Sequence, residues 1–201
     1  MQLLIASLAG YYTIVCAAAG SAEDAARVAS ELVGAASPTR ESKQQFFQRF
    51  GASYRRLVAT ELMAQEVVGY EWRTMTPSQQ AEITQLYEKI VMAALHGAYD
   101  AALPARFILV DSAPYRSQAG KNKKRCTLLQ MTDCNFYSAK TKASDVTVEY
   151  RLIETKSGWQ VADLLINEKS VQEIYETSIQ EVLKFGTESA LDKLRARVSQ
   201  Y

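Results

Sequence analysis

The sequence has few of the residues that usually carry metal or phosphate chemistry. Its 201 residues include one histidine, His96, and three cysteines. A zinc site takes several Cys or His ligands at short characteristic spacings, and these residues show no such spacing. The sequence also has no glycine-rich phosphate loop, low-complexity tract or internal repeat. These absences argue against a metal site, a phosphate-loop protein and a repeat architecture.

The sequence also lacks an excess of either sign of charge. Its 23 Lys and Arg residues against 22 Asp and Glu residues give a formal net charge of +1. Proteins that bind nucleic acid usually carry a clear basic excess, because they neutralise phosphate groups. We therefore expect no nucleic-acid partner.

The N-terminal segment is apolar and carries no charged residue before Glu23. The apolar run from Leu3 to Cys16 is followed by small residues at positions 17–22, as in the cleavage region of a secretory signal. A transmembrane anchor is the alternative, but the run is near the lower limit of about 17 residues needed to cross a bilayer. We expect residues 1–22 to be a cleaved signal peptide and residues 23–201 to form a single domain.

Two cysteines, Cys126 and Cys134, remain after this segment is removed. If the chain between them forms a hairpin centred on Gln130, the two side chains lie opposite each other. An oxidising compartment then allows a disulfide bond. The pair is a candidate disulfide, with two unlinked thiols as the alternative.

The first half of the remaining chain has the periodicity of helices. Apolar residues recur at helical spacing in three segments, which are residues 22–36, 42–58 and 61–68. Thr76, Pro77 and Gln79 then form the capping pattern that begins a long helix, which continues to Pro104. The apolar face of this helix comprises Ile83, Leu86, Tyr87, Ile90, Val91, Ala94 and Ala98. Such a face must pack against another layer.

The second half of the chain has the pattern of an antiparallel sheet. Four segments are rich in β-branched and aromatic residues, namely residues 106–115, 125–137, 145–154 and 159–166. In the third segment, apolar residues occupy alternate positions, at Val146, Val148, Tyr150 and Leu152. The chain then returns to helical spacing, and one expected face comprises Val171, Ile174, Tyr175, Ser178 and Val182. Helices before and after a block of strands predict an α+β fold.

Few side chains are candidates for catalysis. His96 has no acid or nucleophile at helical spacing, so we interpret it as a packing or surface residue. Asp111 and Asp163 lie in predicted strands, where burial in a cavity would raise the pKa of either carboxyl, although a hydrogen-bonded strand aspartate is the simpler interpretation. A basic run is interpreted as a solvated hairpin loop, or as a contact for anionic headgroups or an acidic partner. It consists of Lys121, Lys123, Lys124 and Arg125.

Two motifs follow each other along most of the domain. The first is Val68-Gly69-x-x-Trp72-Arg73 with Thr76-Pro77-x-Gln79, and the second is Tyr150-Arg151-Leu152 with Gly158-Trp159-x-Val161-x-Asp163. In this order and spacing the sequence resembles the MlaC family of periplasmic phospholipid-binding proteins, also called the toluene-tolerance auxiliary family, from about Phe46 to Leu194. One departure is that Glu168 and Lys169 stand where the family usually has a glycine.

The resemblance implies helices packed on a curved antiparallel four-stranded sheet that encloses an apolar cavity for acyl chains. Small residues late in the long helix agree with this, because they leave room opposite the sheet. The candidate lipid-binding residues are Ile90, Ala94, Ala98, Val146, Val148, Tyr150, Leu152, Trp159, Val161 and Ile174. Either face of the sheet can line such a cavity, and a tryptophan at Val148 or Leu152 is expected to reduce lipid carriage in a folded protein.

The resemblance also implies a function. It indicates a monomeric periplasmic carrier, not an enzyme and without a cofactor. This carrier shuttles phospholipid between an inner-membrane ABC transporter complex and an outer-membrane lipoprotein complex, and so maintains outer-membrane lipid asymmetry. A hopanoid-associated branch shares the domain, so a hopanoid or other terpenoid lipid is an alternative cargo. Two other classes remain open: a small isomerase or dehydratase that uses Asp163 or Asp111 with Tyr150, and an interaction adaptor with a filled core.

Overall fold

The computed structural model describes residues 21–37, 39, 41–102, 108–114, 125, 128–129, 134–143 and 146–199. Its helices are α1 (Ala22–Ala36), α2 (Lys43–Leu57), α3 (Thr60–Val68), the 3-10 helix η1 (Gly69–Thr74), α4 (Pro77–Ala102), α6 (Val171–Leu183) and α7 (Thr187–Val198). Its strands are β1 (Ile108–Pro114), β2 (Phe136–Ala143), β3 (Val146–Thr155), β4 (Gly158–Ile166) and β5 (Lys169–Ser170). Residues 1–20 lie outside the described residues, so the signal peptide stays a prediction.

Helices α2 and α4 begin where the sequence places capping residues. At the start of α4, the Gln79 amide donates to the Thr76 hydroxyl, and the Gln79 side chain accepts from the Thr76 amide at 2.8 Å. The same reciprocal arrangement joins Ser42 to Gln45 at the start of α2. The predicted helix starts are therefore confirmed, because a capping box depends only on residues three positions apart. No helix among the described residues is long and apolar enough to span a membrane.

The strands form one antiparallel sheet in the order β1-β2-β3-β4-β5. The α+β fold is thus confirmed, with a short fifth strand that the sequence pattern did not predict. The strand predicted over residues 125–137 is wrong at its start. Arg125 and Leu128 are helical, and the Leu129 amide donates to the Arg125 carbonyl at 3.0 Å. A short apolar run fits a helix and a strand equally well, so its periodicity does not separate the two.

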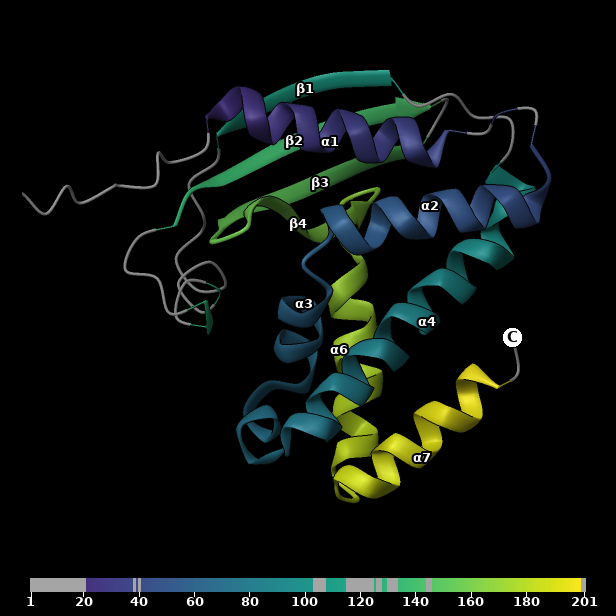
Figure 1. Cartoon of the computed structure of the whole chain (residues 1–201), viewed down its shortest axis with the longest axis vertical. Coiled ribbons are helices and arrows are strands. Elements are labelled where there is room, and N and C mark those ends of the chain that lie inside the picture. Colours follow the sequence, from purple (N-terminus) through teal and green to yellow (C-terminus); the bar gives the residue numbers. More distant parts are fainter. Residues whose placement is uncertain are drawn as a thin grey trace, which may run out of the picture.

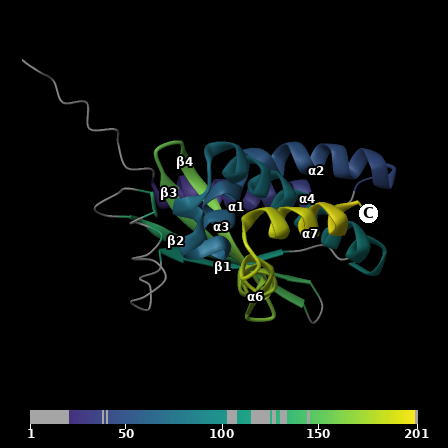
Figure 2. The same ribbon diagram turned by 90° about the horizontal axis from the view of Figure 1, so that it is seen from below.

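Helices cover the sheet on one side and extend away from it at one end. Figure 1 shows α1 lying across the strands, whereas α3, α4, α6 and α7 form the lower part of the molecule. Seen from below in Figure 2, α4 and α7 run side by side. An ion pair joins them, from Arg195 Nε to Glu82 Oε1 at 2.6 Å.

Strand β4 contains a β-bulge that divides the apolar residues between two cores. Arg151 lies opposite Asp163 and Leu152 lies opposite Val161, so Ala162 is an extra residue on β4. One face of the sheet contributes Leu152 and Val161 to a large main cluster with the helices. The other face contributes to a second cluster, whose buried members are Ala59, Leu62, Ile153 and Ala162. Both faces of β3 are therefore covered by apolar side chains near its C-terminal end.

The turn between β4 and β5 places two residues in the left-handed region. Asn167 has φ of 47° and Glu168 has φ of 68°, as in the two-residue hairpin turn that favours Asn-Gly. Because a side chain at positive φ is strained, Glu168→Gly is expected to raise the free energy of unfolding by about 1 kcal/mol. Urea titration measures this difference. Glu168→Ala is the matched control, since it keeps the Cβ, and an equal gain in both variants would contradict the explanation.

The buried face of α6 differs from the predicted one. The buried residues are Gln172, Ile179 and Leu183, whereas Ile174 is 58% exposed. Of the predicted face, Tyr175 and Val182 are partly buried against the main cluster, whereas Ile174 and Ser178 are exposed, so the prediction is wrong at these two positions. The buried face differs from the predicted one because the polar residue Gln172 is buried, and its partners lie on other elements.

Candidate functional site

A pocket of about 680 Å³ opens where α2 ends, α3 begins and β3 turns into β4. The corner between the two helices is fixed by the sheet. Val58 forms a parallel bridge with Val161, and the Ala59 amide donates to the Val161 carbonyl at 2.8 Å. The chain is extended at Val58 and turns back into a helix at Thr60. The path of the chain therefore leaves an open corner beside the start of α3.

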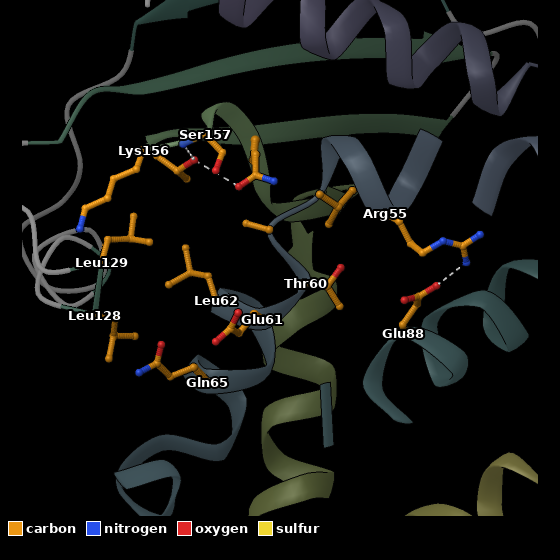
Figure 3. A pocket seen from close by; sticks show the side chains of 14 residues that line it. Arg55, Thr60, Glu61, Leu62, Gln65, Glu88, Leu128, Leu129, Lys156 and Ser157 are labelled. Carbon is orange, nitrogen blue, oxygen red and sulfur yellow. Dashed lines mark hydrogen bonds and ion pairs between the residues drawn. The ribbon is translucent and has the colours of Figure 1, made fainter. Parts of the chain in front are cut away.

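The pocket has an apolar floor and a polar rim. The floor is formed by Val58, Ala59, Leu62, Leu128 and Leu129, four of which belong to or pack on the second cluster. The rim carries both signs of charge, from Arg55, Lys156, Glu61 and Glu88. Figure 3 shows Lys156, Leu128 and Leu129 at one end and the Arg55–Glu88 pair at the other. The pocket thus presents an apolar surface beneath groups that suit a polar or zwitterionic ligand end.

The Arg55–Glu88 pair closes one end of the pocket. Arg55 Nη1 donates to Glu88 Oε1 at 2.9 Å and joins α2 to α4. The Arg55 side chain is 61% exposed, and exposed pairs of this kind contribute only about 0–1 kcal/mol to stability. Breaking this ion pair alone therefore has a small energetic cost.

Beside the pocket, a buried polar network surrounds Arg125. The Arg125 guanidinium donates from Nε to Glu66 Oε1 at 2.7 Å and from Nη2 to Gln172 Oε1 at 3.0 Å. Its Nη2 also lies 3.7 Å from Asp163 Oδ2, and the Gln172 amide donates to Glu66. Buried charges are tolerated when they are paired and hydrogen-bonded. The network therefore ties the chain at Arg125 to α3, β4 and α6.

Asp163 completes the network next to β5. Its carboxylate accepts hydrogen bonds from the Ser170 hydroxyl at 3.0 Å and from the Leu164 amide at 2.8 Å. Burial raises the pKa of the Asp163 carboxyl above its ordinary value, and the nearby Arg125 and the Ser170 hydrogen bond oppose that rise. The net direction is upward, so desolvation outweighs the partners.

The chain is similar to known proteins in sequence and in structure. The sequence matches the family described as MlaC protein over residues 23–197. The chain belongs to the MlaC family. A phospholipid-binding protein from Ralstonia solanacearum, solved in complex with a phospholipid, is similar in structure, with a TM-score of 0.64 and 16% sequence identity. That likeness covers 90% of this chain and 98% of the other, and it shows a shared fold. No curated protein sequence matches the chain.

Most of the lipid-binding residues expected in this MlaC-family chain lie in its main cluster. The buried ones are Ile90, Tyr150, Leu152, Trp159 and Val161. Val148 is half-buried and packs against the same cluster. None of the ten expected residues lines any of the three pockets described for the chain. Their contact with lipid therefore stays a prediction, which requires the helices to separate from the sheet.

The remaining expected residues lie elsewhere. Val146 is 38% exposed at the start of β3, and Ile174 is exposed on α6. The side chains of Ala94 and Ala98 lie outside the described residues, as does that of His96. The pocket residues Leu62, Leu128 and Leu129 were not among the expected ones. Leu62 lies in a predicted helix. The only signal of Leu128 and Leu129 in the sequence was that they form an apolar pair, which was interpreted as part of a strand.

The residues of the alternative enzyme do not form one site. Asp111 is exposed on β1, whereas Asp163 is buried in the Arg125 network. Tyr150 lies opposite Leu164 in the sheet, so its side chain and that of Asp163 are on opposite faces. Within the described residues, no group of His, Cys, Asp and Glu is placed to hold a metal ion.

Two further expectations concern the segment before β2. Arg125 was expected in a solvated loop, and that expectation is wrong, because Arg125 is only 3% exposed. Its carboxylate partners are distant in sequence, and a run of basic residues gives no sign of them. Cys134 takes part in a disulfide bond. Cys126 lies outside the described residues, so the pairing of these two cysteines stays a prediction.

The raised pKa of Asp163 predicts how stability depends on pH. When a carboxyl binds its proton more tightly in the folded state, the protein loses stability as the pH rises. The loss runs from the ordinary pKa of 3.8 through the raised pKa of the folded state. Asp163→Asn removes this titration. We expect the difference in unfolding free energy between wild type and variant to shift in favour of the variant as the pH rises from about 3.8 to neutral. Denaturant titrations at several pH values measure it, and a constant difference would contradict the raised pKa.

Proposed function

We propose that the chain is a periplasmic lipid carrier that binds a phospholipid and shuttles it between membranes. The observation that carries this proposal is the match to the MlaC family over residues 23–197. The shared fold with a protein solved in complex with a phospholipid supports it. The chain acts alone as a monomer, needs no cofactor and catalyses no reaction.

In this proposal the pocket at the start of α3 is the mouth of the lipid site. The mixed-charge rim meets the headgroup, and acyl chains pass over the apolar floor toward the hydrophobic clusters. Burial of an acyl chain contributes about 0.8 kcal/mol per CH₂ group, which is enough to extract a lipid without covalent chemistry. The inner part of the opened cavity is then lined by the expected residues of the main cluster, which are Ile90, Val148, Tyr150, Leu152, Trp159 and Val161.

The partners of the proposed carrier lie in the two membranes. An ABC transporter complex in the inner membrane and a lipoprotein complex in the outer membrane exchange lipid with it. Transfer of misplaced phospholipid between them maintains outer-membrane lipid asymmetry. The direction of net transfer depends on these complexes and their source of energy.

The proposal is tested by mass spectrometry of the solvent extract of the purified protein. The chain is expressed with its N-terminal segment in a Gram-negative periplasm and purified without detergent. Near-stoichiometric phospholipid is the expected result, and a hopanoid from a native host would place the chain in the hopanoid-associated branch. Protein without any bound lipid would overturn the carrier function.

A variant that fills the mouth is expected to carry less lipid. Leu129 is half-buried on the pocket wall, so Leu129→Trp fills the space without overpacking a core. We expect bound lipid to fall at least about tenfold, since loss of a few buried CH₂ groups is enough for this change. The extract of the purified variant measures it. Tyr70→Trp, at a residue 76% exposed on η1, is the control, and equal lipid content in both variants would exclude this mouth.

A further inference from the structure

Two buried tyrosines behind the pocket have hydroxyl groups that lack a hydrogen-bond partner. Tyr54 on α2 and Tyr87 on α4 are each 1% exposed. Among the residues that the structure describes, nothing accepts from or donates to either hydroxyl within hydrogen-bond geometry. A buried polar group without a partner destabilises a protein, so native structures rarely keep one without a reason.

Each of the two tyrosines adjoins a residue that lines the pocket, although neither tyrosine lines it itself. Tyr54 precedes Arg55 and Tyr87 precedes Glu88, and the latter two side chains form the ion pair visible in Figure 3. Burial raises the pKa of the Tyr87 hydroxyl above its ordinary value, and the nearby Tyr54 adds to that rise. Burial raises the pKa of the Tyr54 hydroxyl, and Thr60, which lines the pocket, opposes that rise. Thr60 is thus a polar neighbour of this hydroxyl, although the two do not meet hydrogen-bond geometry. The two tyrosines therefore lie next to residues of the pocket, on the side of the main cluster.

The surroundings select the kind of group that the hydroxyls can bind. Glu66 and Asp163 lie near enough to raise the pKa of Tyr87, and Glu88 does the same for Tyr54. These carboxylates are paired with Arg125 and Arg55, so an anionic group such as a phosphate would have to compete with them for the same two cations. A neutral acceptor has no such cost. The third buried group without a partner in the described chain, Trp159 Nε1, can only donate, so the main cluster as a whole needs acceptors.

We propose that Tyr54 and Tyr87 donate hydrogen bonds to the ester carbonyl oxygens of a bound diacyl lipid. The inference rests on the carrier function proposed above and adds the chemical group that is recognised. The headgroup remains at the charged rim, the ester linkages lie one layer inside it, and the acyl chains continue into the apolar cluster. The carrier then distinguishes ester-linked from ether-linked lipids, because an ether oxygen is a much weaker acceptor than a carbonyl.

The test is a competition between two lipids within one sample. The protein is incubated with vesicles that contain equal amounts of dioleoyl phosphatidylethanolamine and its dialkenyl ether analogue of the same chain length. The protein is then separated from the vesicles, and mass spectrometry gives the ratio of the two bound lipids. We expect wild type to be enriched in the ester lipid by about fivefold to tenfold, the change expected for a net hydrogen bond of ordinary strength.

Three variants give the inference its sharpest test. Tyr54→Phe and Tyr87→Phe are each expected to reduce the enrichment, and the double variant is expected to bind both lipids equally. The apoprotein should not melt at a lower temperature in any of them, since the lost hydroxyl had no partner. Tyr70→Phe removes an exposed hydroxyl and should keep the wild-type ratio.

Two outcomes would overturn the inference in different ways. If wild type binds both lipids equally and the variants do not change this ratio, ester recognition is wrong while the carrier function stands; ordered water would then satisfy the hydroxyls. If wild type takes up neither lipid, the carrier function itself is wrong. Loss of ester enrichment in the variants, with unchanged uptake of the ether lipid, is the result that supports the inference.

Discussion

Replacement of Arg125 with methionine is expected to lower the free energy of unfolding by about 3–5 kcal/mol. Arg125 is buried with the carboxylates of Glu66 and Asp163, and its removal leaves that negative charge in a site that water does not reach. Methionine is unbranched and uncharged, so the change removes the guanidinium charge and its hydrogen bonds while it keeps an aliphatic side chain at the site. Equilibrium unfolding in urea, followed by tryptophan fluorescence, measures the loss.

Two comparisons isolate the cause. Arg195→Met breaks an ion pair at the protein surface between α7 and α4, and little change is expected there. The double variant Arg125→Met with Glu66→Met removes a positive and a negative charge together, and it should recover part of the lost stability. An equal loss of unfolding free energy in Arg125→Met and Arg195→Met would show that the buried network stabilises the protein no more than a surface ion pair does.

Replacement of Leu152 with alanine is expected to cost about 2–5 kcal/mol of stability. Leu152 is 1% exposed at the centre of the main cluster, where neighbouring side chains surround the space it would vacate. The same urea titration measures the change. Leu152→Trp, suggested by the sequence as a block of the lipid cavity, is not suitable for that purpose, because a larger side chain overpacks this site.

Val146→Ala provides the matched control on the same strand. Val146 and Leu152 share one face of β3 by their spacing, but Val146 is 38% exposed. A change within about 0.5 kcal/mol is expected for it. A large effect at both positions would mean that the whole strand face is packed, in conflict with the exposure of its first residue.

Local signals in the sequence predicted the local structure well. The start of α4 was predicted from Thr76, Pro77 and Gln79, because a capping box joins residues that are neighbours in the chain. The antiparallel β3–β4 pair was predicted from its alternation and its turn residues. Strand β5 was missed because two residues are too few to show any alternation.

Features that depend on distant partners were not predictable. Gln172 is buried because it meets Glu66 and Arg125, so the apolar pattern of α6 alone did not mark it as part of the buried face. The extra residue Ala162 directs neighbouring parts of β4 to different cores, and no local signal marks such a bulge. The pocket shares this origin: its wall at Leu128 and Leu129 comes from a segment far in sequence from α3. The resemblance to the MlaC family supplied the fold, and the tertiary contacts supplied the site.

The Arg125 network also constrains the order in which the chain can fold. Its hydrogen bonds join residues that are 47, 59 and 106 positions apart, so they depend on three distant segments of the chain. Closing such long loops has an entropic cost before any contact forms. If Arg125 or Glu66 were buried early, its charge would lack its counterpart. The three segments must therefore arrive nearly together, which makes the β-sheet and the helical part of the molecule fold as one cooperative unit.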